Sequence, residues 1–344
     1  MGQSEIEQLV HNSLRKKVLS TKRIYAGRNS KVYKVLCESG ETYAVKFYTQ
    51  LTADGLSRLE QEWAAISFMT QSGIENIPAP VAIDSSKQAA IYTFINGTPV
   101  DRIKDNDIHE VLTFLKKLKK SSANEKAPNI SSAAEAFFSP AEVVENIYKR
   151  LNILTALPGE DELFREMHLF LEKDFSEELE KSTTFAKSQL GIETWNSPLP
   201  EELRTLSPSD LGFHNALRTS HNNLYFVDFE YFGWDDPVKT ASDFLLHPAM
   251  NLTETDIKTF YDGISEIFRN DKNFEIRFKS LLPLFRLKWS LILLNEFSNK
   301  TLKRRAFASG TPDNVQSLRK AQLEKAKLFL AKDKKILNTL FETY

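Results

Sequence analysis

The sequence predicts an α+β fold with two unequal parts: a strand-rich part with one helix over residues 1–98, and a mostly helical part over residues 99–344. Short apolar runs separated by turn residues dominate the first part, whereas apolar residues at helical spacing recur in the second. The string Asn96-Gly97-Thr98-Pro99 lies between the two patterns and consists of residues that favour turns, so we place the boundary there. A chain of 344 residues is long enough for two such parts with a sizeable core.

Residues 24–35 (IYAGRNSKVYKV) predict a β-hairpin. Apolar residues spaced as in strands flank a short tip that contains Gly27, Asn29 and Ser30. The tip of such a hairpin is suited to covering phosphate groups. One glycine is a weak signal for that role, and an ordinary β-turn is the alternative.

Residues 42–48 (TYAVKFY) predict a strand that carries Lys46 among apolar neighbours. The AVK pattern is typical of a strand lysine that holds the α- and β-phosphates of a nucleotide, although most lysines are simply solvated. A partner carboxylate is expected on the next helix, where apolar residues at 56, 59, 63, 66 and 69 show helical spacing. We predict that Glu62 is this partner. Glu60 is the alternative, and on an ordinary amphipathic helix both would face water.

The segment from Leu206 to Asp236 carries the strongest chemical signal. Asp210 and Asn215 are five residues apart in a turn-rich stretch, and Asp228 closes the apolar run 224–227. Phosphoryl transfer needs a carboxylate beside the acceptor hydroxyl and hard oxygen ligands for Mg²⁺. Asp210 would orient the hydroxyl and take its proton, while Asn215 and Asp228 would bind the metal. The alternative is that these side chains only cap turns.

The order of these motifs resembles the aminoglycoside phosphotransferase and choline kinase family, which has a protein-kinase-like bilobal fold. The resemblance covers roughly residues 20–300, and its most specific strings are DLGFHN (210–215) and VDFEYFGWDDP (227–237). It implies transfer of the γ-phosphate of ATP, with Mg²⁺, to a hydroxyl of a small molecule. The long activation segment and APE motif of protein kinases do not follow Asp228, which favours a small-molecule acceptor over a protein.

The same resemblance implies roles for further residues. Residues 27–30 would form the phosphate loop, and the backbone of residues 92–95, which include Phe94 and Ile95, would bind adenine as a hinge. Asp243 would brace the site.

Two positions depart from the family pattern. Pro208 replaces a histidine that usually lies two residues before the catalytic aspartate, and Ala26 stands where a glycine is common. They motivate an alternative function, a catalytically weak pseudokinase that binds nucleotide and acts as a scaffold. His214 is expected to form hydrogen bonds or packing contacts rather than to act as an acid or base.

The acceptor is not fixed by these motifs. An acidic and aromatic wall would attract an ammonium group of an amino alcohol or amino sugar. Its candidate members follow the metal aspartate: Glu230, Tyr231, Phe232, Trp234, Asp235 and Asp236. The alternative is that the aromatic residues are core and the two aspartates cap the turn into Pro237; a neutral sugar or glycan precursor would need no such wall.

The second part shows several helical signals. Ser139-Pro140-Ala141-Glu142 has the pattern of a capped helix start. Helical runs are expected over 143–154 and 163–171, and a long amphipathic helix over 315–340 that docks on the large part.

Composition limits the class of protein. With 45 Lys and Arg against 46 Asp and Glu, the net charge of −1 gives no electrostatic basis for a nucleic-acid or membrane partner. The single Cys37 excludes an intramolecular disulfide and fits a reducing compartment. The apolar stretch at 289–294 is far too short to span a bilayer. We therefore predict a cytoplasmic protein.

Overall fold

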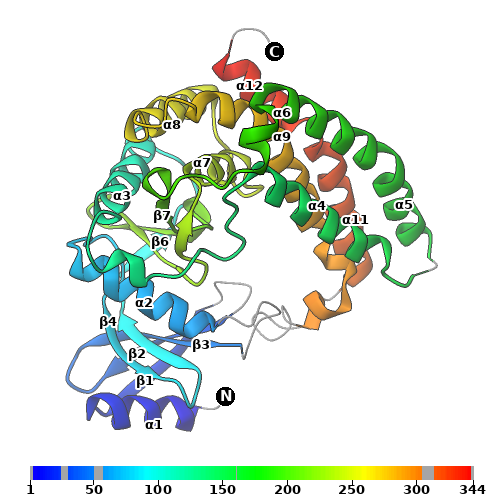
Figure 1. Ribbon diagram of the computed structural model, residues 1–344. Helices are drawn as coiled ribbons and strands as arrows, with labels where there is room; N and C mark the ends of the chain where they lie inside the picture. Colours follow the sequence, from blue (N-terminus) through cyan, green and yellow to red (C-terminus); the bar gives the residue numbers. More distant parts are fainter. Residues whose placement is uncertain (1–2, 25–29, 50–56, 160, 304–313, 342–344) are drawn as a thin grey trace.

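The computed structural model has two lobes, a small one built on a sheet and a large one built mostly of helices (Figure 1). It describes all residues except 1–2, 25–29, 50–56, 160, 304–313 and 342–344. The predicted α+β bilobal architecture is thereby confirmed. The small lobe consists of α1 (Gln3–Leu14), β1 (Val18–Ile24), β2 (Ser30–Cys37), β3 (Thr42–Tyr48), α2 (Arg58–Gln71), β4 (Pro80–Asp84) and β5 (Ala89–Thr93).

The small-lobe sheet is antiparallel, in the order β1-β2-β3-β5-β4, and is covered by a helix on each face. Because successive side chains of a strand point to opposite faces, β3 divides its residues between the two helices. Val45 and Phe47 pack with Leu9 and other residues of α1, whereas Tyr48 packs with Leu59 and other residues of α2. Lys46 shares the face of Tyr48, so the strand period directs its ammonium toward α2.

Two short sheets form the connection to the large lobe. β6 (Gly97–Pro99), β8 (Ala216–Thr219) and β9 (Leu224–Phe226) make one sheet, and β7 (Thr205–Ser207) pairs with β10 (Gly233–Asp235) in the other. The segment around Asp210 therefore leaves β7 and enters β8, and the segment around Asp228 leaves β9. β6 lies within the predicted boundary string Asn96–Pro99 and pairs with β8, so this connection lies beside the segment that carries the candidate catalytic residues.

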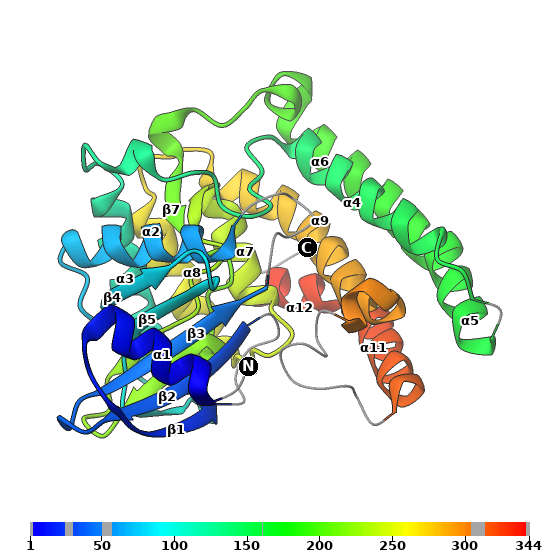
Figure 2. The same cartoon turned by 90° about the horizontal axis from the view of Figure 1, so that it is seen from below.

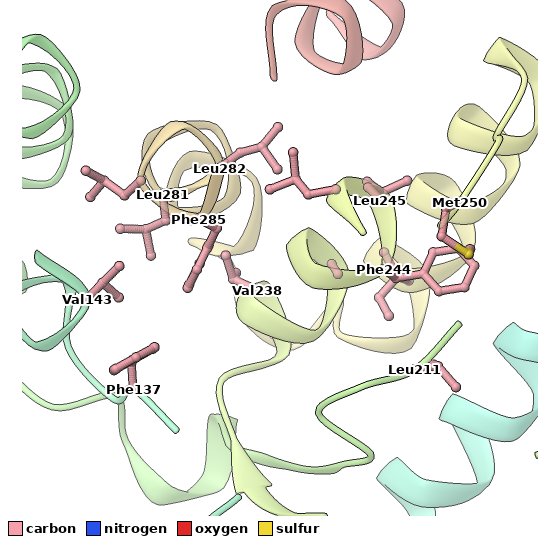
Figure 3. Close-up of a cluster of buried hydrophobic side chains, with 14 of the residues drawn as sticks. Phe137, Val143, Leu211, Val238, Phe244, Leu245, Met250, Leu281, Leu282 and Phe285 are labelled. Carbon is pink, nitrogen blue, oxygen red and sulfur yellow. The ribbon is translucent and has the colours of Figure 1, made fainter. Parts of the chain in front are cut away.

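Helix α9 (Phe274–Leu293) is central to the large lobe, where it contacts α4, α6, α7, α11 and α12. In Figure 3, Phe285 of α9, Val238 of α7 and Val143 of α4 come together in the apolar core. The helices of this lobe are α3 (Asp107–Ser121), α4 (Pro140–Thr155), α5 (Glu162–Phe170), α6 (Ser176–Asn196), α7 (Pro237–Leu246), α8 (Glu254–Ile267), α9, α11 (Val315–Phe329) and α12 (Lys332–Leu340), with short 3-10 or π turns at Ala127–Asn129, Leu171–Phe175, Glu201–Leu203, Phe213–Asn215 and Leu294–Phe297.

The structure corrects two sequence predictions. The small lobe contains α1 in addition to the expected helix, because Ile6, Leu9 and Val10 form an apolar face that packs on the sheet. The expected long helix over 315–340 is two helices, α11 and α12, separated between Phe329 and Lys332. Both contact α9, so the C-terminal segment docks on the large lobe as expected (Figure 2). Within the described residues, no helix is both long enough and apolar enough for a membrane crossing.

The predicted start of α4 is confirmed. The Ser139 hydroxyl accepts a hydrogen bond from the Glu142 backbone N–H, and the Glu142 carboxylate accepts one from the Ser139 N–H. This capping box satisfies two N–H groups that the first helical turn would otherwise leave unpaired.

Replacing Ser139 with Ala should lower the free energy of unfolding by about 1 kcal/mol, because the helix loses this cap. Urea unfolding followed by circular dichroism measures the change. Ser188→Ala on the exposed surface of α6 is the matched control and should change the free energy by less than about 0.5 kcal/mol. Equal effects of the two substitutions would contradict the assigned cap.

Candidate active site

Lys46 lies at the centre of a buried cluster of carboxylates. Its Nζ is 2.6 Å from Glu62 Oε2, 2.6 Å from Asp228 Oδ1 and 3.9 Å from Glu230 Oε2. Lys46 is only 6% exposed and Glu62 only 2%. Burial opposes the charge on the ammonium, but Asp228, Glu62 and Glu230 together raise the pKa of Lys46 well above its ordinary value. The ammonium is thus a fixed cation at this point.

Glu62 joins three parts of the chain through its two oxygens. Oε2 accepts hydrogen bonds from Lys46 of β3 and, at 2.7 Å, from the Tyr48 hydroxyl, while Oε1 accepts one at 3.0 Å from the Phe229 N–H after β9. A buried carboxylate is tolerated because each oxygen has donors. Glu60, the alternative partner, is exposed to solvent. The structure therefore brings Lys46 together with Glu62, as predicted, and shows that Glu230 belongs to the same cluster.

Asp210 lies in the loop between β7 and β8, with its side chain 34% exposed. Its Oδ1 is 3.2 Å from His214 Nε2 and 3.7 Å from His247 Nε2, and its Oδ2 accepts a hydrogen bond of 3.2 Å from Asn215 Nδ2. Burial opposes ionisation, but these neighbours, His214 first, lower the pKa of Asp210 to about 2. The carboxylate is therefore ionised at neutral pH and able to accept a hydrogen bond from a hydroxyl.

His214 and His247 stack face to face beside Asp210, with ring centroids 3.9 Å apart and an angle of 6° between the planes. Gly212 makes room for this arrangement, because a Cβ there would lie 2.5 Å from ring atoms of His214. The Ala249 N–H donates to His247 Nδ1, so the neutral ring carries its proton on Nε2, facing Asp210. Burial first, and then His214, lower the pKa of His247 to about 3. His214 thus forms a hydrogen-bonding and packing contact, as expected.

The two predicted metal ligands belong to adjacent segments. The Val227 N–H donates to the Asn215 carbonyl at 2.9 Å, which ties the turn containing Asn215 to the residue before Asp228. Asn215 Nδ2 donates to the Asp210 carbonyl, so the amide oxygen is directed away from Asp210. That oxygen and the partly exposed Asp228 carboxylate are hard ligands of the type that Mg²⁺ prefers. The donor chemistry of the site fits the metal.

Backbone strain accompanies both aspartates. Asp228 has φ 69° and Ser209, immediately before Asp210, has φ 63°. Residues other than glycine rarely adopt this left-handed conformation, and such outliers cluster at active sites.

The predicted nucleotide-binding residues fall partly outside the described structure. Gly27 and Asn29 lie among residues 25–29, which are not described, whereas Ser30 is buried at the start of β2 and pairs with Tyr48 of β3. Phe94 and Ile95 follow β5 directly as a half-buried connection to β6. The Phe94 ring lies 4.5 Å from Lys34 Nζ.

The acidic and aromatic wall predicted for a cation is not assembled in this structure. Asp235 is 0% exposed, and its carboxylate is 2.6 Å from Lys239 Nζ. Asp236 caps α7 through the Val238 N–H and pairs with Arg277 at 2.5 Å. Phe232 is buried in the core, and the Trp234 indole donates to the Ala127 carbonyl. The geometry favours the alternative interpretation, in which the aromatic residues pack in the core and the aspartates stabilise the turn into Pro237.

Lys239 and Trp289 of this region were not predicted as site residues. Lys239, in the first turn of α7, lies between two carboxylates. Its Nζ is 2.6 Å from Asp235 Oδ2 and 3.1 Å from Asp243 Oδ2. Trp289 of α9 donates to Asp243 Oδ1 at 2.8 Å and contacts the ring of His247. The i,i+4 spacing of Lys239 and Asp243 is visible in the sequence. The contact between Trp289 and His247, in contrast, depends on how α7 and α9 pack.

No protein-family model matches the sequence, and no curated protein matches it. Solved structures do match. Spectinomycin phosphotransferase APH(9)-Ia in complex with ADP and spectinomycin aligns with a TM-score of 0.63 and 15% identity, over 94% of this chain and 98% of that one. Choline kinase from Cryptosporidium parvum Iowa II aligns with a TM-score of 0.59 and 13% identity, over 98% and 97%.

An ethanolamine kinase from Plasmodium vivax is similar to a comparable degree, with a TM-score of 0.59 and 14% identity over 95% of this chain and 87% of that one. At such low identities, likeness over nearly the whole length establishes the architecture. The chain therefore has the protein-kinase-like fold of the aminoglycoside phosphotransferases and the choline and ethanolamine kinases.

Proposed function

We propose that this protein transfers the γ-phosphate of ATP to a hydroxyl group of a small molecule, with Mg²⁺ as the metal. The observation that carries the proposal is the contact of the buried Lys46 with both Glu62 and Asp228. This contact holds the Lys46 ammonium beside Asp228, the candidate metal ligand, although the two residues are 182 positions apart in the sequence. The fold supports it, since the three structural neighbours described above are named as kinases of small molecules or phosphotransferases.

In this proposal, each side chain has one role in positioning or charge stabilisation. Lys46, held by Glu62, contacts the α- and β-phosphates. Asp210 accepts a hydrogen bond from the acceptor hydroxyl and takes its proton as the oxygen bonds to the γ-phosphorus and the bond to the leaving ADP oxygen breaks. His214 and Asn215 hold the Asp210 carboxylate in place. Phe94 and Ile95 line the adenine hinge, and Gly27, Asn29 and Ser30 form the phosphate loop.

Asn215 and Asp228 would hold Mg²⁺, which supplies positive charge against the phosphate oxygens when bound. The structure supports this assignment through the hydrogen bond between their segments and the orientation of the Asn215 amide. A cytoplasmic location and a small-molecule acceptor, rather than nucleic acid, complete the proposal and are in keeping with the single cysteine and the net charge of −1.

Asp210→Asn should lower the rate of acceptor-dependent ATP consumption by about 10²–10⁴-fold, because the variant cannot take the proton. Binding of Mg–ADP, measured by calorimetry, should be unchanged, since Asp210 is assigned to the hydroxyl and not to the nucleotide. The assay uses a panel of amino alcohols, amino sugars, neutral sugars and aminoglycosides. Nucleotide binding without turnover of any acceptor by the wild type would favour the pseudokinase scaffold.

Glu62→Gln should lower ATP consumption and nucleotide affinity by about 10- to 100-fold, because Lys46 loses one of its two close carboxylates and moves from the phosphate position. Glu60→Gln is the matched control: it lies two residues away on the same helix, but its side chain is exposed. Steady-state kinetics with varied ATP distinguish the two. Similar kinetics for both variants would refute the assigned Lys46–Glu62 pair.

A further inference from the structure

His247 places a hydrogen-bond donor beside the candidate catalytic aspartate, and the proposed phosphoryl transfer gives this donor no role. His247 Nδ1 accepts a hydrogen bond from the Ala249 N–H at 3.2 Å, so the ring hydrogen lies on Nε2. Nε2 is 3.7 Å from Asp210 Oδ1, which is too long for a hydrogen bond between the two groups. Among the described residues, none accepts a hydrogen bond from this N–H.

The surrounding packing holds the His247 ring in this orientation. The ring stacks on His214, with centroids 3.9 Å apart, and packs against Trp289 at 4.8 Å with the planes at 87°. The Trp289 indole in turn donates to Asp243 Oδ1 at 2.8 Å, and Lys332 donates to the His247 carbonyl at 3.3 Å. A donor that is fixed before a ligand arrives loses little conformational entropy when it binds.

The His247 donor is accessible from the solvent side of the candidate active site. The side chain of His247 is 15% exposed and that of Asp210 is 34% exposed. Both Asp210 oxygens have donors of their own inside the protein: Oδ1 accepts from His214 and Oδ2 from Asn215. The carboxylate is thus held without a hydrogen bond from His247, and the Nε2–H remains for an incoming molecule.

The chemistry of this N–H group limits what it recognises. An imidazole N–H binds a lone pair, such as that of a hydroxyl, ether or carbonyl oxygen. An ammonium group has only hydrogens to offer, so it would leave the His247 donor unpaired. The reacting hydroxyl is a poor partner as well, because a hydrogen bond donated to its oxygen would withdraw electron density from the atom that attacks the phosphorus. An oxygen on the adjacent carbon is better placed, since it bonds to His247 while the reacting hydroxyl bonds to Asp210, only 3.7 Å away.

We propose that His247 binds an oxygen adjacent to the hydroxyl that is phosphorylated, so that the acceptor is a vicinal diol such as a sugar or polyol. The inference rests on the proposed function and names the substrate class of the same site. It agrees with the position of the residues predicted to attract an ammonium group, since Asp235 and Asp236 are buried and paired with cations of the protein itself. An amino alcohol whose ammonium lies on the adjacent carbon leaves the His247 donor unpaired.

The test uses acceptors that share a hydroxyl and differ in the group on the adjacent carbon. Glycerol, propane-1,3-diol and serinol carry a hydroxyl, only hydrogens and an ammonium group there. A ring series repeats the comparison with cis-cyclohexane-1,2-diol, cyclohexanol and cis-2-aminocyclohexanol. Acceptor-dependent consumption of Mg–ATP by the full chain gives kcat and KM for each compound. The diol of each series should have the highest kcat/KM and the amine the lowest.

His247→Phe separates binding of the adjacent oxygen from a structural role of the ring. Phenylalanine keeps a planar ring for the stack on His214 but has no N–H. The value of kcat/KM should therefore fall by about 3- to 30-fold for glycerol and cyclohexanediol and stay unchanged for the compounds with only hydrogens on that carbon. A structural role would lower it for every acceptor. His247→Gln, which offers an amide N–H, should recover part of the loss, and KM for Mg–ATP should be the same in both variants.

His109→Phe is the matched control, because His109 lies exposed on α3 and should affect no acceptor. The proposal is overturned if an amine has a higher kcat/KM than the diol of its series, or if neither diol is phosphorylated. It is also overturned if His247→Phe leaves the diols unchanged or lowers all members of a series equally.

The proposed kinase function fails separately from this inference. It fails if the wild type does not bind Mg–ADP in calorimetry, or if Asp210→Asn retains the acceptor-dependent ATP consumption. Turnover of the amines in preference to the diols, lost in Asp210→Asn, would leave the kinase function intact and remove only the role of His247.

Discussion

The ion pair of Lys46 with Glu62 and Asp228 is the interaction on which the two-lobe arrangement depends. A buried lysine with two buried carboxylates and the partly exposed Asp228 would be costly unless each found partners, and here the partners come from β3, α2 and the segment after β9. Side chains of both lobes meet in this cluster. The small lobe supplies the cation and one carboxylate, and the large lobe supplies Asp228 and Glu230, so lobe contact and site formation are one event.

In the large lobe, buried aspartates are likewise paired with cations. Lys239 and Arg277 satisfy the aspartates that begin α7, and Lys332 of α12 donates to the carbonyl of Leu246 at its end. Helix α7 is thereby fixed at both termini by side chains from its own first turn, α9 and α12. Because His247 follows α7 directly, this fixation sets the position of the imidazole beside Asp210.

Local sequence predicted those features that depend on local pattern. The strand over Thr42–Tyr48, the capped start of α4 and the proximity of Lys46 to Glu62 follow from strand alternation, capping chemistry and helical spacing. The sequence did not predict that Asp235 would be buried by Lys239, or that His247 would stack on His214, because both depend on how α7 packs. The aromatic and acidic residues between Glu230 and Asp236 therefore suggested a binding surface for a cation, although Phe232, Asp235 and Asp236 are buried in the folded chain. Similarly, the break between α11 and α12 lies within a continuous apolar pattern that carries no strong helix-breaking residue.

The left-handed backbone at Asp228 restricts how this position can vary through evolution. Asparagine and glycine enter that conformation most easily, and β-branched or bulky side chains do so only at a cost. Of the residues that adopt this left-handed conformation readily, only aspartate also carries a negative charge. The backbone conformation and the need for an anionic metal ligand therefore favour the same residue independently. A lineage that lost phosphoryl transfer would consequently be expected to drift at Asp228 toward asparagine or glycine, and not toward the longer glutamate that would preserve the charge.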